Sequence, residues 1–345
     1  MSTYKDSGVN IDAGDQASAM AYQAAKSTFS ARAGMIGEPV RLDGGFAGLL
    51  DFGGYYLVKN DDGVGTKIAI AEAINDFSTL GYDLLAMVVD DAICLGAEVI
   101  SVTNTIDCNK VKPEVVEPMM NGLAAACREQ KIVIPGGEIA EMNTLVNGYI
   151  WNASALGIVA KDKVITGKDV QVGDQIIGLP DPGFRSNGFS LVRYVLKNAL
   201  GENWFDQIYE NGVSWGKTVL TPSRIYHNDL LQILGRHGEA RKLNIRGIAH
   251  ITGGGLAGNF ERILKHDETL GAKFTDLLEP PAFMQKIVEL GGIAREEAYR
   301  TFNMGIAMTL VVDPATVEPL LAELTKLGIN AKLMGEITAT GKIEF

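Results

Sequence analysis

The sequence predicts a mixed α/β or α+β protein of two domains, and three observations support this fold class. The chain has 345 residues, enough for two domains of ordinary size. From Tyr55 onward, short apolar runs of strand length alternate with longer runs of helical periodicity. A polar stretch with two glycines, Lys161–Gly173, interrupts this alternation near mid-chain. We therefore expect an N-terminal domain of residues 1–170 and a C-terminal α/β domain of residues 171–345.

In the N-terminal half, the glycine-punctuated residues 1–50 contain one Ala-rich helical stretch, and regular elements follow. The expected helices are Ala17–Lys26, Leu80–Leu95 and Glu114–Gln130, and the expected strands are Tyr55–Val58, Glu98–Ile106, Lys131–Ile134 and Tyr149–Val159. In the C-terminal half we expect strands at Gln175–Leu179, Arg246–Ala249, Gly305–Val312 and Ala331–Ile337, and helices at Gly188–Ala199, Ser223–Arg236, Leu256–Leu264, Pro281–Leu290 and Pro314–Leu327.

Composition excludes several classes of function. The formal net charge of −11 at pH 7 argues against a nucleic-acid partner and against an anionic membrane surface. No apolar run reaches membrane-spanning length, and the first residues lack the pattern of a signal peptide. The three cysteines form no CxxC pair and no zinc spacing. We expect a cytoplasmic protein.

The most informative segment is Asn60–Lys67, where a strand-like run leads into two carboxylates, a turn with two glycines, a hydroxyl and a lysine. Glycines let the backbone approach an anion, and successive N–H groups form a nest for phosphate oxygens. Asp62 offers hard oxygens to Mg²⁺, and Lys67 offers a point charge to phosphate. A metal–nucleotide explains this combination, and a glycine-rich hairpin with solvated charges is the alternative.

Two further acidic clusters lie in the same half. Asp90 and Asp91 lie inside an apolar run, where an unpaired carboxylate costs several kcal/mol. They either bind a metal or substrate, or mark the break from helix to solvent. Glu138 and Glu141 follow two glycines. On a helical turn they would share a face and flank one cation, and the alternative is a charge pair at a helix N-terminus.

Two glycine-containing turns in the C-terminal half precede helices. Gly183–Gly188 contains Ser186 and Asn187, which either cap the following helix or donate to an anion. His250–Gly255 places three glycines between a strand and a helix, a geometry that exposes N–H groups to phosphate. His250 is either structural or a general acid/base. These clusters predict two separate anion sites, with the metal–nucleotide in the N-terminal half and a metal-free phosphate in the C-terminal half.

The motifs, in their order along the chain, resemble the phosphoribosylformylglycinamidine cyclo-ligase family, also called aminoimidazole ribonucleotide synthetases. The resemblance runs from Tyr4 to about Met334, and it rests on the ordered set rather than on any one motif. The motifs are YKDSGVNIDAG at Tyr4–Gly14, DGVGTK at Asp62–Lys67, GGEIAEM at Gly136–Met142, SNGFSLVR at Ser186–Arg193, LTPSRIY at Leu220–Tyr226, AHITGGG at Ala249–Gly255 and YRTFNMG at Tyr299–Gly305.

The resemblance implies a homodimer whose N-terminal halves form a joint β-barrel at the interface, with ATP in a nearby cleft. It implies ATP-dependent ring closure of formylglycinamidine ribonucleotide to aminoimidazole ribonucleotide, with release of ADP and phosphate, in purine biosynthesis. ATP phosphorylates the formamide oxygen, the amidine nitrogen attacks the activated carbon, and phosphate leaves.

The resemblance also implies roles for individual residues. The implied ligands of Mg²⁺ and the triphosphate are Asp62, Asp91, Glu138 and Glu141. The implied nucleotide contacts are Lys5 and Asp12 in a segment that folds over the nucleotide, and Gly63, Gly65, Thr66 and Lys67. The implied ribonucleotide contacts are Thr252, Gly253, Gly254 and Gly255 at the 5′-phosphate, and Ser186, Asn187 and Asn303 as positioning donors. The implied catalytic residues are His250 as acid/base, Asp91, and Lys67 as the neutraliser of developing charge.

The chain departs from the family pattern at four positions. Arg185 stands where histidine is usual, and arginine does not exchange protons at neutral pH. Asn104 stands where an aspartate is usual, and Tyr22 stands where a lysine is expected, one turn before Lys26. Asp61 is expected to make the first site more acidic.

Rival families share the implied fold. They are formylglycinamidine ribonucleotide synthetase, selenophosphate synthetase, thiamine-phosphate kinase and the hydrogenase-maturation carbamoyl dehydratase. The order of motifs favours the cyclo-ligase, and no cysteine precedes Cys94, whereas a selenophosphate synthetase would need one near the N-terminus. A non-catalytic ATP-binding regulator of the same fold is the alternative from a different class.

Overall fold

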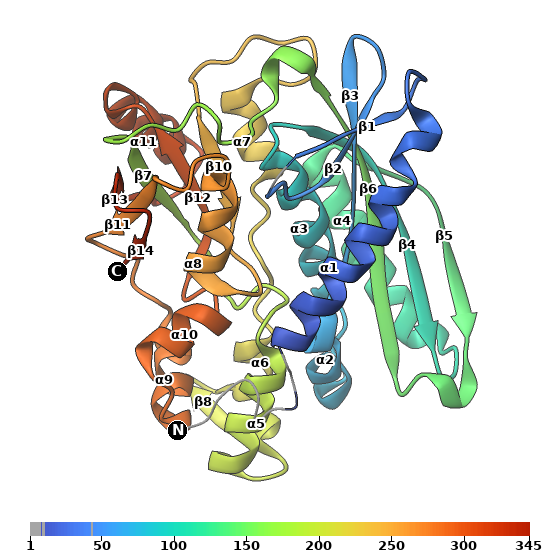
Figure 1. Cartoon of the computed structure of the whole chain (residues 1–345). Helices are drawn as coiled ribbons and strands as arrows, with labels where there is room; N and C mark the ends of the chain where they lie inside the picture. The colour runs from blue at the N-terminus through green and yellow to red at the C-terminus, as the bar shows by residue number, and fades with distance from the viewer. Residues whose placement is uncertain (1–7, 9–10, 43) are drawn as a thin grey trace.

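The computed structural model describes residue 8, residues 11–42 and residues 44–345. Two six-stranded sheets lie side by side, with helices packed around and between them (Figure 1). One sheet is built from residues 38–160 and the other from residues 175–344. This arrangement confirms the mixed α/β, two-domain fold that the sequence predicts.

The N-terminal sheet has the strand order β1-β2-β3-β6-β4-β5, and all its pairs are antiparallel except β4 with β5. Its strands are β1 (Glu38–Val40), β2 (Gly48–Asp51), β3 (Tyr55–Gly63), β4 (Glu98–Cys108), β5 (Val133–Glu141) and β6 (Tyr149–Ala160). Alternate residues of β6 are buried, because α3 (Leu80–Ile93) and α4 (Pro113–Gln130) cover one face of the sheet. On the opposite face, α1 (Ile11–Ser27) shares a pocket with residues of β2 and β3.

Three short or peripheral elements complete this half. They are α1 (Ile11–Ser27), α2 (Ile68–Ile74) and the 3-10 turn η3 (Gly65–Lys67), with further 3-10 turns at Phe29–Arg32, Asn143–Leu145 and Lys161–Lys163. Helix α1 crosses the front of the molecule in Figure 1, and most of its described side chains are exposed.

The C-terminal sheet has the strand order β10-β12-β7-β13-β11-β14. Its strands are β7 (Gln175–Pro180), β10 (Gly247–His250), β11 (Gly271–Phe274), β12 (Ile306–Val312), β13 (Lys332–Thr338) and β14 (Ile343–Glu344), and a separate hairpin pairs β8 (Ile208–Glu210) with β9 (Val213–Ser214). Its helices are α5 (Phe189–Leu200), α6 (Trp215–Val219), α7 (His227–Leu234), α8 (Gly255–Phe260), α9 (Ala282–Gly291), α10 (Arg295–Thr301) and α11 (Val317–Lys326), with 3-10 turns η6 (Trp204–Asp206), η7 (Glu261–Leu264) and η8 (Pro314–Thr316).

The two halves share one continuous hydrophobic core. Helix α3 lies at their junction, where it contacts β3 and β6 of its own sheet and α7 and β10 of the other half (Figure 1). Its run of apolar residues is buried along nearly its whole length because it packs on both sides. None of the described helices is long and apolar enough to cross a membrane.

Most expected elements are present, and two expectations were wrong in detail. The strand expected at Lys131–Ile134 instead runs from Val133 through Pro135, Gly136 and Gly137 to Glu141. An edge strand tolerates this sequence because one side of it needs no ladder partner. The helix expected at Ser223–Arg236 begins only at His227, since the preceding residues form an extended segment that contacts α3.

Candidate active site

Two carboxylates meet where β3 ends and α3 approaches its C-terminus. Burial raises the pKa of Asp62 to about 6, the Gly63 N–H offsets part of the rise, and the Asp91 carboxylate adds to it. Burial also raises the pKa of Asp91 to about 7. Two neighbouring, poorly solvated carboxylates favour a bound cation, because a cation relieves both the desolvation and the repulsion.

Both oxygens of the Asp91 carboxylate have protein partners. His250 Nδ1 lies 2.8 Å from Oδ1, and the Asn60 side-chain amide donates to Oδ2 at 3.3 Å. His250 ends β10 and is fully buried, and burial lowers its pKa well below the ordinary value. The Asp91 side chain keeps 18% of its surface exposed. Asp91 is therefore the member of this pair that a ligand can touch, and His250 lies behind it.

Two atoms beside this pair are buried without a hydrogen-bond partner in the described part of the chain. They are His250 Nε2 and Asn60 Oδ1. Buried polar atoms are normally paired, so these two indicate a water or ligand atom at this position.

The two glycine turns converge on one loop, Gly183–Gly188. A Cβ on Gly65 would lie 3.2 Å from the Ser186 carbonyl oxygen, so the first turn is packed against this loop. A Cβ on Gly253 would lie 3.1 Å from Asn187 Oδ1, so the second turn approaches the same loop from the other side. The prediction of two anion sites stays a prediction, and the fold brings both turns to the domain junction.

The second turn has a backbone that requires glycine. Gly254 and Gly255 have φ of +92° and +66°, and a Cβ on Gly255 would overlap the Tyr299 carbonyl oxygen. The Asn259 side-chain amide donates to the carbonyl oxygens of Gly253 and Gly255 at 3.1 and 2.8 Å. These bonds fix the turn and leave Gly253 and Gly254 exposed to solvent.

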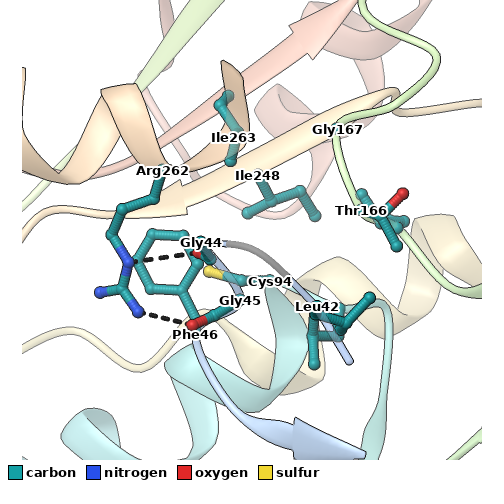
Figure 2. Close-up of a pocket in the computed structure, with 12 residues that line it drawn as sticks. Leu42, Gly44, Gly45, Phe46, Cys94, Thr166, Gly167, Ile248, Arg262 and Ile263 are labelled. Carbon is teal, nitrogen blue, oxygen red and sulfur yellow. Dashed lines mark hydrogen bonds between the residues drawn. The ribbon is translucent and has the colours of Figure 1, made fainter. Parts of the chain in front are cut away.

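Arg262, which the sequence reasoning missed, joins this site to the N-terminal half. Its guanidinium donates to the carbonyl oxygens of Gly44 and Gly45 at 3.3 and 2.7 Å and stacks on the Phe46 ring, 3.8 Å from the ring centre (Figure 2). The same cation lowers the pKa of Asp91 against the effect of burial. It holds the Gly44–Phe46 loop against η7 and supplies positive charge near the acidic pair.

Comparison with known proteins follows the same two-part organisation. Residues 44–159 match the N-terminal domain, and residues 171–345 the C-terminal domain, of the AIR synthase related protein family. The chain is 39% identical to phosphoribosylformylglycinamidine cyclo-ligase of Pyrococcus furiosus over 94% of this chain and 92% of that protein. It is also 39% identical to the enzyme of the same name from Clostridium perfringens, over 99% and 98% of the two chains. The chain belongs to the phosphoribosylformylglycinamidine cyclo-ligase family.

Solved structures of the wider fold are more distant. Hydrogenase maturation protein HypE in complex with ATP is 16% identical, with a TM-score of 0.58 over 83% of this chain and 80% of that one. At this identity the likeness shows the fold alone.

Among the implied family residues, Lys67 is not open to a ligand. Its ammonium lies 2.8 Å from Asp83 Oδ1 with both side chains fully buried, and it donates to the Thr221 carbonyl oxygen at 2.8 Å. Asp83 lies two turns before Asp90 on the same face of α3, and it also accepts from the Ser223 N–H and hydroxyl. A second carboxylate in the apolar run was the available signal for this partner, and the sequence reasoning missed it.

Glu138 and Glu141 lie away from the acidic pair. In register, Asp62 faces Ala153 of β6, Ala153 faces Asn104 of β4, and Asn104 faces Gly137 of β5. Three strand spacings of about 4.8 Å place β5 roughly 14 Å from Asp62, beyond the reach of one shared ion.

The two glutamates also do not share a face. On a strand, residues three apart point to opposite faces, and Glu141 accepts from the Val111 N–H at 2.9 Å. The helical turn expected here is therefore wrong. Among the residues that the structure describes, no three His, Cys, Asp or Glu side chains are arranged to hold a metal ion. The four-carboxylate metal site is not assembled within one chain.

Three departures from the family pattern have structural explanations. Asn104 Oδ1 accepts from the Trp151 indole N–H at 3.0 Å, so Asn104 is part of the core. Asp61 accepts from the Ser154 hydroxyl on the open face of the sheet, so the expectation that it makes the first site more acidic is wrong. In α1, the Lys26 ammonium lies 4.7 Å from the centre of the Tyr22 ring.

The remaining implied residues fall into three groups. Ser186 is buried and its hydroxyl has no partner among the described residues, whereas Thr66 is exposed and its hydroxyl lies 3.4 Å from that of Ser190. Asn303 is buried and donates to the Gly183 carbonyl oxygen at 3.0 Å, which braces the junction loop. Lys5 and the side chain of Asp12 lie outside the described residues.

Proposed function

We propose that the domain junction is where this chain carries out the reaction of its family, the ATP-dependent closure of formylglycinamidine ribonucleotide to aminoimidazole ribonucleotide. The observation that carries the proposal is the convergence of both glycine turns on the Gly183–Gly188 loop, whose Arg185 also acts electrostatically on Asp91. The reaction needs both ligands side by side at one place, because the γ-phosphoryl group moves to the formamide oxygen of the ribonucleotide.

ATP and Mg²⁺ belong with the acidic pair in this proposal. Asp62 and Asp91 fit a hard divalent cation, because both are oxygen donors whose ionised forms are poorly compensated by the protein. The ion would neutralise charge on the triphosphate. The exposed turn at Gly65 and Thr66 offers N–H groups and a hydroxyl to the phosphates. The ATP complex of HypE, which has the same fold, supports the nucleotide.

Lys67 and His250 act from buried positions. Lys67 lies directly behind the first turn, so its charge reaches the phosphates through the protein, while Asp83 balances part of it. His250 fixes Oδ1 of Asp91, and Oδ2, which accepts from the Asn60 amide at 3.3 Å, keeps a second lone pair for the ligand. In this proposal His250 orients the Asp91 side chain, and Asp91 contacts the reacting groups.

The ribonucleotide belongs with the second turn. The exposed backbone of Gly253 and Gly254 suits the 5′-phosphate, with Thr252 and Gly255 completing the turn. Asn187 lies beside this turn and contacts the Met87 sulfur of α3, one turn before Asp91, and Ser186 offers a hydroxyl without a partner among the described residues. Asn303 supports both by holding Gly183.

We also propose a homodimer formed through the open face of the N-terminal sheet, the face opposite α3 and α4. Ile100 of β4 and Ile150 of β6 are 41% and 46% exposed on this face, and the edge strand β5 is exposed along most of its length. These exposed isoleucines and the long unpaired edge favour burial against a second copy, whose equivalent sheet would complete a barrel. Glu138 lies on this face and would meet the second copy. Cytoplasmic residence remains a prediction from the sequence.

One assay tests the proposal against the regulator alternative. ADP release and formation of the aminoimidazole product are measured with formylglycinamidine ribonucleotide present and absent. Ribonucleotide-dependent ADP release at one ADP per product supports the cyclo-ligase. Tight nucleotide binding without product over many hours would identify a regulator instead.

A further inference from the structure

Arg185 is a fully buried cation at the domain junction. Its guanidinium pairs with Asp90 Oδ2 at 2.6 Å and with Asp181 Oδ2 at 2.8 Å, and all three side chains have no exposed surface. It also donates to the Arg224 carbonyl oxygen at 3.1 Å. With no exposed surface, the guanidinium cannot contact a ligand directly.

The two carboxylates anchor different parts of the molecule. The other oxygen of Asp90 accepts from the N–H groups of Tyr226 and His227 at 3.0 Å each, at the start of α7. The other oxygen of Asp181 accepts from the Gly183 N–H at 2.8 Å. Arg185 therefore links α3 of the N-terminal half to both the junction loop and α7 of the C-terminal half.

Each end of this link lies next to a proposed ligand contact. Asp91 follows Asp90 on α3, and Ser186 and Asn187 follow Arg185 in the loop. Arg185 has φ of +56°, a conformation that non-glycine residues rarely adopt, so the loop bends sharply at this residue. The ion pairs hold a bend that the local backbone does not favour.

We propose that Arg185 is a positioning residue, and that Asp181 is its required partner. The pair sets the distance between the Ser186–Asn187 donors on the ribonucleotide and Asp91 at the nucleotide. This inference rests on the proposed function and adds to it a residue that touches neither ligand.

The geometry requires a planar cation with two separate donors. Lysine offers one ammonium, which can pair closely with Asp90 or Asp181 but cannot reproduce the fork between them. The carboxylate left over would keep its backbone N–H donors but would be buried without a counter-charge, which is strongly unfavourable. The effect of Arg185→Lys must then depend on whether residue 181 carries a charge.

The test is a double-mutant cycle of Arg185→Lys and Asp181→Asn, read by steady-state kinetics for each substrate. We expect Arg185→Lys to raise the KM for formylglycinamidine ribonucleotide about tenfold or more, with the KM for ATP changed by less than about twofold. Asp181→Asn alone should have a smaller effect. In the double variant the KM for formylglycinamidine ribonucleotide should return much of the way to that of the unaltered chain, because asparagine removes the charge left without a partner.

The chain offers a matched control in Arg246, which also bridges two aspartates, Asp174 and Asp313, at the far end of the C-terminal sheet. Arg246→Lys should lower the melting temperature and leave both KM values unchanged. If Arg185→Lys likewise changes only the melting temperature, or if the double variant shows simply additive losses, the inference is overturned. Absence of turnover in the unaltered chain would instead overturn the proposed function, so the two failures are distinguishable.

Discussion

The two faces of the N-terminal sheet differ in what covers them. The helical face carries α3, whose aspartates at positions 83 and 90 are buried and paired with cations. The other face carries exposed isoleucines at positions 100 and 150 and an edge strand without a neighbour. The helical face is completed within the chain, and the open face is the surface that we propose for a second copy.

This difference between the two faces shows that buried ion pairs and apolar contacts specify structure to different degrees. Buried ion pairs demand particular partners at particular distances, so they fix how the C-terminal half meets α3. An apolar face specifies only that something apolar must cover it. We therefore propose that the helical face sets the catalytic geometry and that the open face mediates assembly. The four experiments below test that division.

The largest effect is expected from Asp62→Asn. Asparagine keeps the size and one oxygen of the side chain but removes the charge that the proposed Mg²⁺ requires. Turnover should fall at least about 100-fold, with unfolding by denaturant little changed. The measurement is ADP release against Mg²⁺ concentration. Wild-type turnover at every Mg²⁺ concentration would remove Asp62 from the site.

The second expected effect is on the stability of the junction turn. In Gly255→Ala the new methyl group would overlap the Tyr299 carbonyl oxygen, and φ is +66°, so we expect a loss of about 3 kcal/mol or more. Gly258→Ala in the same helix is the control, because a Cβ there has open space. That change should be neutral or stabilise by up to about 1 kcal/mol. Equal stability of the two variants in urea unfolding would contradict the described turn.

The third effect concerns the open face. Ile150→Lys places a charge on the surface proposed to be buried between two copies, so light scattering should show a monomer with the circular dichroism spectrum of the unaltered chain. Ile208→Lys in the C-terminal hairpin is the control, since Ile208 is 61% exposed on a different part of the molecule. A dimer that persists in Ile150→Lys would place the interface elsewhere.

The smallest expected effect is a pH dependence of stability caused by His227, the first residue of α7. Its Nε2 accepts from the Val99 N–H at 2.8 Å, and burial lowers its pKa to about 3. His227 is neutral in the folded protein, so its contribution to the free energy of unfolding is fully present above pH 6.5. It is lost as the pH falls toward 3, because the unfolded chain takes up the proton first.

We expect that loss to reach a few kcal/mol at most. His227→Gln keeps an acceptor for Val99 but does not titrate, so its stability should fall less steeply between pH 6.5 and 4. The comparison is denaturant unfolding at several pH values, with the exposed His237→Gln as control. Parallel pH profiles for the three proteins would exclude His227 as the cause.

Sequence reasoning succeeded where local pattern decides the outcome. The apolar periodicity of α3 and α4 and the alternation of β6 depend on neighbours within a few residues, so their existence was predictable. It failed at Glu138 and Glu141, where a Gly-Gly pair typical of a turn continues an edge strand. Whether such a segment is a strand depends on β4 beside it, which is distant in sequence.

In the candidate site, too, some features were predictable from local sequence and others were not. The residue types at Asp62, Asp91 and the Thr252–Gly255 turn indicated anion and metal chemistry, because glycines, carboxylates and hydroxyls have intrinsic ligand preferences. The partner of Lys67 and the two partners of Arg185 were not predictable from spacing. Those pairs span 16, 95 and 4 residues, and no local rule connects them.

By itself, the sequence determined the fold class, the family and the kinds of groups available for chemistry, because these follow from periodicity, motif order and side-chain type. Only the tertiary structure decided which groups meet. It brought two turns from different halves to one loop, buried two cations that local pattern would leave in solvent, and placed Glu138 and Glu141 on opposite faces of an edge strand. The physical reason is that a buried charge is stable only beside its partner, and the folded chain alone determines where that partner lies.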